Sequence, residues 1–305
     1  MSANQEPADE TQPVAGSFHS IRPLSDKVFS TFQRFLEKET GIHLSAVKKS
    51  LLVGRLSRRL RDLHLTTFED YYERVVADTQ ERQIFINAIC TNETHFFREP
   101  HHFEFITEHL LPGWQARRKH DASQRRVRVW SAACSTGEEP YSLAMLLLDK
   151  LPAAEGWEIE ILATDLSTKA LDRAKAGLWP VGKASEIPTP LLKRFMLRGY
   201  DEMEGTMKIG PELQRAVNFQ PFNLTADSYP TWLGSFDMIF CRNVLIYFGQ
   251  ATKNLVVERL LQHLEPNGHL FLGHAESLVN LPFAARAIAP AVYQPSAQPH
   301  KRGPR

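Results

Sequence analysis

The chain has 305 residues, of which 43% are hydrophobic and 23% are charged, as in an average globular protein. Its 36 lysines and arginines nearly balance 35 aspartates and glutamates, and the net charge of +1 argues against a protein that coats nucleic acid. The sequence has no uncharged apolar run near the roughly 18 residues of a membrane span, no secretory signal in its first twenty residues and only three widely spaced cysteines. We therefore expect a reduced cytoplasmic protein without direct membrane insertion.

The N-terminal part of the chain is predicted to form a small all-helical domain over residues 21–112, after a polar tail at 1–20. Ser25 is a cap signal for a first helix, whose apolar residues recur at helical spacing until Gly41. Further helices are predicted over 46–63, from Thr67 onward and over about 80–90. No part of this region alternates for long like a strand.

After a charged linker expected at 113–126, strands alternate with helices over 127–293. The predicted strands are 127–133, 158–165, 236–243 and 269–274, and the predicted helices are 141–151, 167–176 and 250–264. This alternation predicts an α/β fold with a Rossmann-like, mainly parallel sheet. Residues 180–230 interrupt this alternation. Within them, the segment 193–224 predicts short antiparallel strands, an insertion over about 195–224. A second tail is expected at 294–305.

The segment WSAACSTGEEPY (130–141) joins the first predicted strand to a helix, where open parallel sheets bind ligands. Its small residues allow close approach to the backbone, but it is not the GxGxxG of dinucleotide folds, and Glu138 and Glu139 would repel phosphate. S-adenosylmethionine fits better, because it carries a sulfonium, an ammonium and a ribose but no phosphate. Asp165 ends the second strand, where an acid can accept the ribose hydroxyls. Taken singly, the loop could be a plain turn and Asp165 a helix cap; together they favour methyl transfer.

Five motifs resemble the chemotaxis receptor methyltransferases of the CheR type: THFFREPHHF (94–103), RVWSAACSTGEEPYSLA (128–144), ATDLS (163–167), FNL (222–224) and FDMIFCRNVLIYF (236–248). The resemblance covers about residues 25–293. It implies methylation of glutamate side chains on bacterial chemoreceptors, which gives glutamyl methyl esters and S-adenosylhomocysteine. Glutamate, with a pKa of about 4.3, is already ionised at neutral pH, so this reaction needs positioning more than a strong base.

The resemblance also implies roles for individual residues. Those expected to bind the cofactor are Asn92, Thr94 and Arg98 at its methionine end, Glu139 at its ammonium, Asp165 at its ribose, Asn223 and Leu224 at its adenine, and Arg242 and Asn243 on the floor of the site. Arg98 and Tyr247 are the expected catalytic residues, which orient the incoming glutamate. No metal is expected, because the histidines near His101 lack a metal-binding spacing.

The predicted helix over 46–63 carries six basic residues and a single acid, Asp62. At 100° per residue, Lys48, Arg55, Arg58 and Arg59 fall in one arc, opposite an apolar arc. This pattern is equally consistent with a solvent-exposed basic face and with a surface that contacts an anionic partner. With the resemblance, docking of the cytoplasmic domain of a methyl-accepting receptor is the favoured interpretation.

Two alternatives remain open at this point. The same catalytic domain could act on a non-receptor substrate, or the chain could be a non-catalytic adaptor that senses S-adenosylmethionine. The favoured interpretation also implies a monomer that is cytoplasmic, recruited to membrane receptor arrays and without a nucleic-acid partner.

Overall fold

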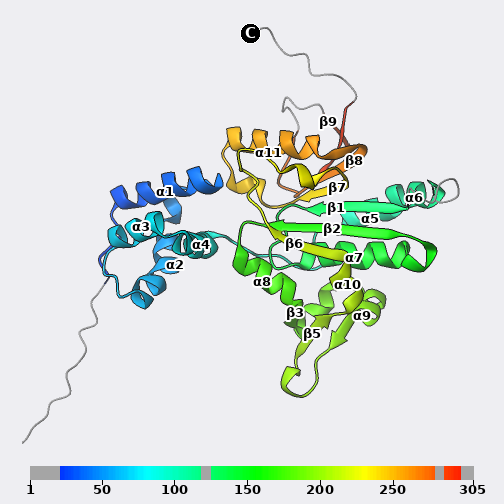
Figure 1. The fold of residues 1–305 in the computed structure, drawn as a ribbon, viewed down its shortest axis with the longest axis horizontal. Helices are drawn as coiled ribbons and strands as arrows, with labels where there is room; N and C mark the ends of the chain where they lie inside the picture. Colours follow the sequence, from blue (N-terminus) through cyan, green and yellow to red (C-terminus); the bar gives the residue numbers. More distant parts are fainter. Residues whose placement is uncertain (1–20, 118–124, 279–284, 297–305) are drawn as a thin grey trace, which may run out of the picture.

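The structure is a computed structural model, and it describes residues 21–117, 125–278 and 285–296 (Figure 1). The tail expected at 1–20 and most of the one expected at 294–305 lie outside these residues, as does the middle of the expected linker. A helical group near the N-terminus lies to one side of a larger domain built around a sheet (Figure 1).

The helical domain begins with α1 (Asp26–Thr40), which has the predicted caps. The Ser25 hydroxyl accepts a hydrogen bond from the Val28 N–H at 3.3 Å, and Gly41 ends the helix at a φ of 71°. A Cβ on Gly41 would lie 2.5 Å from the side chain of Thr225 in the sheet domain, so glycine is also required by this close approach.

Three more helices complete this domain: α2 (Lys49–Asp62), α3 (Phe68–Ala77) and α4 (Thr79–Ile89). The predicted helix over 46–63 differs at its start, where η1 (Ala46–Lys48) is a 3-10 turn. Buried aromatic rings hold the helices together. The Phe32 ring stacks on Phe85 at 5.4 Å and meets the edge of Tyr72 at 5.3 Å.

A second helical run, not predicted from the sequence, leads into the sheet domain. It consists of α5 (Pro100–Phe105), a π-helical turn η2 (Ile106–Leu110) and α6 (Leu111–Arg117). Its buried residues Phe103, Ile106 and Trp114 belong to the apolar core of the sheet domain. The expected domain boundary at 112 falls within this run; the buried residues of the helical core end at Ile89, and those of the sheet-domain core begin at Phe96.

The main sheet has seven strands in the order β6-β2-β1-β7-β8-β10-β9. The first five of these strands are parallel, and β10 and β9 add an antiparallel edge. Their bounds are β1 (Arg126–Ser131), β2 (Glu158–Asp165), β6 (Val217–Pro221), β7 (Phe236–Cys241), β8 (Leu264–Leu272), β9 (Ala285–Ala289) and β10 (Val292–Pro295). The predicted mainly parallel α/β sheet is confirmed.

Both faces of the sheet are buried. Along β7, Met238 and Phe240 belong to one apolar cluster, and Ile239 and Cys241 belong to another. Because successive side chains of a strand point to opposite faces, these two clusters lie on opposite sides of the sheet. The connecting helices are α7 (Glu138–Lys150), α8 (Thr168–Ala176) and α11 (Gln250–Gln262), with short turns at η4 (Ala153–Glu155), η7 (Thr231–Leu233) and η8 (Leu245–Tyr247).

The insertion differs from the prediction at both ends. Its three-stranded antiparallel sheet has the order β3-β5-β4, with β3 (Leu178–Pro180), β4 (Met196–Arg198) and β5 (Thr206–Ile209). The prediction that 217–221 is antiparallel is wrong, because β6 pairs in parallel with β2 in the main sheet. Helices fill the remainder: η5 (Val181–Glu186), α9 (Thr189–Phe195), η6 (Asp201–Met203) and α10 (Pro211–Ala216).

Two smaller differences concern the end of the chain. The strand predicted over 269–274 begins earlier, because β8 starts at Leu264, and its pairing with β7 shifts between Phe236 and Met238. The strands β9 and β10 were not predicted, and β10 includes the first residues of the expected tail. None of the helices in the described ranges is long and apolar enough to cross a membrane.

Arg59 provides a test of the helical domain. It donates to Glu81 at 2.9 Å, and the Glu81 side chain is only 2% exposed. Because removal of one partner leaves a buried charge uncompensated, Arg59→Ala should lower the free energy of unfolding by about 3 kcal/mol. Arg58→Ala, on the exposed side of the same helix, is the control and should cost less than about 0.5 kcal/mol. Urea denaturation of both variants would measure this, and equal losses would contradict it.

Candidate functional site

A single cavity at the junction of the two domains brings together most of the predicted site residues. Its walls come from the end of α1 and η1, the segment 89–98, the loop after β1, the end of β2 and the loops after β6 and β7. All the expected cofactor-binding and catalytic residues line it: Asn92, Thr94, Arg98, Glu139, Asp165, Asn223, Leu224, Arg242, Asn243 and Tyr247. Of the four basic residues of the docking face, only Lys48 does.

The loop after β1 is shaped by two left-handed residues, Ser135 with a φ of 51° and Gly137 with a φ of 98°. A Cβ on Gly137 would lie 2.9 Å from the side chain of Ala174 in α8, so only glycine fits there. The loop thus turns tightly from β1 into α7 and places Glu139 in the first turn of that helix, facing the cavity.

Asp165 ends β2 beside this loop. Its carboxylate accepts hydrogen bonds from the backbone N–H groups of Ser135 and Ser167, each at 2.8 Å. Burial raises the pKa of Asp165, and these two hydrogen bonds oppose that rise. A carboxylate has about four acceptor sites, so two hydroxyl groups of a ligand can still bind. Asp165 therefore both holds the loop and offers acceptors to the cavity.

Arg242 lies beneath the cavity with its side chain only 2% exposed. Its guanidinium pairs with Glu139 at 3.2 Å and Glu99 at 3.3 Å, and it donates to the carbonyl of Arg98. The other oxygen of Glu139 accepts from the Ser131 hydroxyl at 2.7 Å. Burial raises the pKa of Glu139, whereas Arg242 lowers it. Burial disfavours the ionised forms of both Glu139 and Asp165. These two acids therefore suit a ligand that brings a positive charge and hydroxyl groups.

The segment with Asn92, Thr94 and Arg98 crosses the cavity between the domains. The Asn92 carbonyl accepts from the Ser135 hydroxyl at 3.0 Å, and the Arg98 guanidinium donates to the Glu93 carbonyl at 3.3 Å. Arg98 is half-buried and keeps donors for an anionic group of a ligand.

Asn223 lies at the seam between the domains, where its amide is already hydrogen-bonded. The amide donates to the Glu39 carbonyl at the end of α1 at 2.8 Å, and its oxygen accepts from Thr225. The Asn223 side chain thus joins the domains, and the second N–H of its amide remains for the adenine contact that the resemblance implies. Its neighbour Leu224 is buried and lines the cavity.

Tyr247 also lies at this seam. Its carbonyl accepts from the His43 N–H at 2.7 Å, and an isolated β-bridge joins Ile42 to Phe248. The Lys48 ammonium lies 5.3 Å from the centre of the Tyr247 ring. A cation and a phenol from different domains thus meet on the wall of one cavity.

Two residues of the predicted docking face have internal partners. The Arg55 guanidinium donates to carbonyl oxygens of Ala88, Ile89 and Cys90 at the end of α4 and to the Thr91 hydroxyl. Arg59 pairs with Glu81, as described above. The arc was expected to be one exposed surface, but α4 packs beside it, so only Lys48 and Arg58 remain as docking residues in our proposal.

Sequence reasoning missed a carboxylate that shapes the loop after β7. Glu276 is buried and accepts from the N–H groups of Asn243 and Gly273 at 2.8 Å and of Ile246 at 3.1 Å. Asn243, with a φ of 58°, takes its place in the cavity wall through this contact. Nothing in the sequence near Glu276 marks this role, because its partners in the loop after β7, Asn243 and Ile246, lie 33 and 30 residues away.

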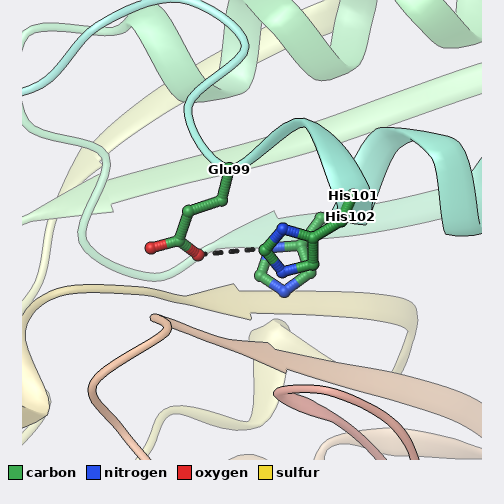
Figure 2. Close-up of side chains that lie close together, drawn as sticks. All are labelled: Glu99, His101 and His102. Atoms are coloured by element: carbon green, nitrogen blue, oxygen red, sulfur yellow. Dashed lines mark ion pairs between the residues drawn. The ribbon is translucent and has the colours of Figure 1, made fainter.

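Glu99, His101 and His102 form a group with ligand atoms within 4.8 Å of one another, the type of cluster that can bind zinc (Figure 2). Figure 2 shows the Glu99 carboxylate reaching toward the overlapping rings. Glu99, however, is already paired with Arg242 and accepts from the His274 N–H at 3.1 Å. The Arg242 charge would repel a divalent cation, so we assign no metal to this group.

His102 gives a pH test. Burial lowers the pKa of His102 from 6.5 to about 3. As the pH falls below 6.5, this histidine therefore becomes protonated in the unfolded chain but stays neutral in the folded protein. The free energy of unfolding should therefore decrease with acidification from pH 6.5, and less steeply in His102→Phe, which keeps the ring contacts with Phe240 and Phe271. Urea midpoints at pH 7 and pH 4.5 would measure this. Identical losses in both proteins would contradict it.

The parallel sheet, Asp165 at the carboxyl end of β2, Glu139 in the first turn of α7 and the cavity between the domains fit a methyltransferase of the S-adenosylmethionine-dependent class. A family model described as CheR methyltransferase, SAM binding domain, matches residues 92–291, and one described as CheR methyltransferase, all-alpha domain, matches residues 27–90. The chain belongs to the CheR methyltransferase family.

Similar proteins agree with this assignment. The chain is 38% identical over 292 residues to chemotaxis protein methyltransferase 2 of Pseudomonas aeruginosa, an alignment that covers 95% of this chain and 100% of that protein. It is 41% identical over 261 residues to the chemotaxis protein methyltransferase of Escherichia coli, with 85% of this chain and 87% of that protein covered. The chain is therefore a methyltransferase of chemotaxis whose cofactor is S-adenosylmethionine.

Proposed function

We propose that this enzyme methylates glutamate side chains on the cytoplasmic domain of bacterial chemoreceptors, for adaptation in chemosensory signalling. The observation that carries the proposal is the meeting of Lys48 with Tyr247 in the cavity that also holds Arg98. Two cations and a hydroxyl group can receive a carboxylate and aim its oxygen at a methyl group. The names of the relatives support a substrate in chemotaxis.

In this proposal the cofactor is held by charge complementarity. Glu139 takes the ammonium, Asp165 the ribose hydroxyls and Arg98 the carboxylate of the methionine moiety. Asn92 and Thr94 contact the same end, and Leu224 packs on the adenine, with Asn223 fixing the wall. Arg242 and Asn243 form the floor.

The transfer itself then depends on position. A substrate glutamate needs no base at neutral pH, and the cofactor supplies an electrophilic methyl on a positively charged sulfur. Arg98 and Tyr247 orient the incoming carboxylate and exclude water from it. Orientation of this kind accelerates a reaction between bound groups by several orders of magnitude.

The receptor is proposed to approach across α2. Lys48 lines the cavity and Arg58 is exposed on the same helix, so both can attract the acidic helices of a receptor stalk. The enzyme would act as a cytoplasmic monomer, recruited to membrane receptor arrays by this contact.

The direct test uses methyl-labelled S-adenosylmethionine with receptor cytoplasmic fragments, followed by mild alkali. We expect label on the receptor that is released as methanol, because a carboxyl methyl ester is hydrolysed under these conditions. A fragment with glutamine in place of the target glutamates is the matched control and should stay unlabelled. Cofactor binding without transfer to any receptor fragment would instead support a non-receptor substrate or a sensing adaptor.

The role of Glu139 has its own test. Glu139→Gln removes the charge that faces the ammonium and should weaken S-adenosylmethionine binding by roughly 10- to 100-fold, as expected for one hydrogen bond to a charged group. Calorimetric titration would measure the affinity. Glu104→Gln, an exposed position on α5, is the control and should leave the affinity unchanged. Equal affinities for the Glu139 variant and the wild type would place the ammonium elsewhere.

A further inference from the structure

The segment 90–99 lines the cofactor cavity without forming a helix or strand, so its backbone groups need partners from elsewhere. Two of these partners belong to the cofactor loop and its helix: the Ser135 hydroxyl donates to the Asn92 carbonyl at 3.0 Å, and the Ser142 hydroxyl accepts from the Phe97 N–H at 2.9 Å. Two more come from the insertion.

The insertion contributes two charged side chains of η5, the turn that directly follows β3. The Lys183 ammonium donates to the Thr94 carbonyl at 3.0 Å, and the Glu186 carboxylate accepts from the Phe96 N–H at 2.8 Å. Both contacts bind the backbone of the segment on either side of His95. The segment is therefore held in register against η5.

The ammonium of Lys183 has a second partner in the cofactor loop. It pairs at 2.6 Å with Glu138, whose side chain is only 2% exposed. A buried carboxylate needs such a cation, and an ammonium has three donors to share. Lys183 thus joins the first turn of α7 to the segment that carries Thr94, two walls of the same cavity.

An aromatic contact strengthens this junction. The buried Phe96 ring meets the buried Trp179 ring of β3 edge-on, with 5.1 Å between their centres. The small sheet therefore holds the segment by packing as well as by polar contacts.

We propose that Lys183, with Glu186 beside it, is a positioning residue for S-adenosylmethionine, and that the insertion is a structural part of the cofactor site. Lys183 sets the separation between α7 and the segment 92–98, and through it the placement of Arg98 and Glu139. The inference rests on the cofactor of the family and is independent of the receptor substrate.

A double variant distinguishes an effect on the geometry of the cofactor site from an effect on the stability of the fold. Lys183→Met alone would leave Glu138 buried and unpaired, so Lys183→Met is combined with Glu138→Gln, which removes that charge. Affinity for S-adenosylhomocysteine is measured by calorimetry, and folding by thermal denaturation without ligand. We expect the double variant to fold and to bind roughly tenfold more weakly, because one hydrogen bond from a charged donor to the segment is lost.

Two further variants complete the experiment. Glu138→Gln alone, which keeps the Lys183 contact with Thr94, should bind more tightly than the double variant. Lys193→Met, at an exposed position of the same insertion, should bind as the wild type does. The proposal is overturned if the folded double variant binds with wild-type affinity or if Glu138→Gln alone accounts for the whole loss. Because binding is the readout, failure here is distinct from failure to methylate a receptor.

Discussion

The cofactor site depends on one buried cation. The Arg242 side chain is 2% exposed, and burial of an unpaired guanidinium would cost several kcal/mol. Its two carboxylate partners come from distant parts of the chain, Glu99 at the start of α5 and Glu139 at the start of α7. The end of β7, the first turn of α7 and the end of the interdomain segment must therefore meet to neutralise it. The contact between these three segments forms the floor of the cavity, around which its other residues are arranged.

Local chemistry made much of this site predictable. The small residues and acids after the first strand indicated a ligand without phosphate, because these features act within one loop. Asp165 was predicted from its position at a strand end, and the parallel arrangement of β1 and β2 brings it to the Ser135 N–H. The caps at Ser25 and Gly41 likewise depend on neighbouring residues only. The alternation of strands and helices predicted the sheet for the same reason.

The features that were missed depend on distant residues. A helical wheel showed that Arg55 and Arg59 share a face, but it could not show that α4 packs beside that face. The partner of Lys183 in the segment lies 89 positions away, and no spacing rule links them. The direction of β6 was wrong because apolar alternation is the same in parallel and antiparallel strands. The sequence pattern does not determine which helices, strands and loops pack against one another. In this protein the walls of the cavity are formed by such contacts between distant segments.

The position of Glu276 also affects how the enzyme forms during synthesis. The helical domain is complete at Ile89 and can fold as soon as it leaves the ribosome, since domains generally fold as units from the N-terminus. The loop after β7, by contrast, donates two backbone hydrogen bonds to Glu276, from the N–H groups of Asn243 and Ile246. That loop cannot reach its final form until nearly the whole chain has emerged. The cofactor site is therefore completed late in synthesis, and a nascent chain carries the four N-terminal helices before it carries a finished catalytic centre.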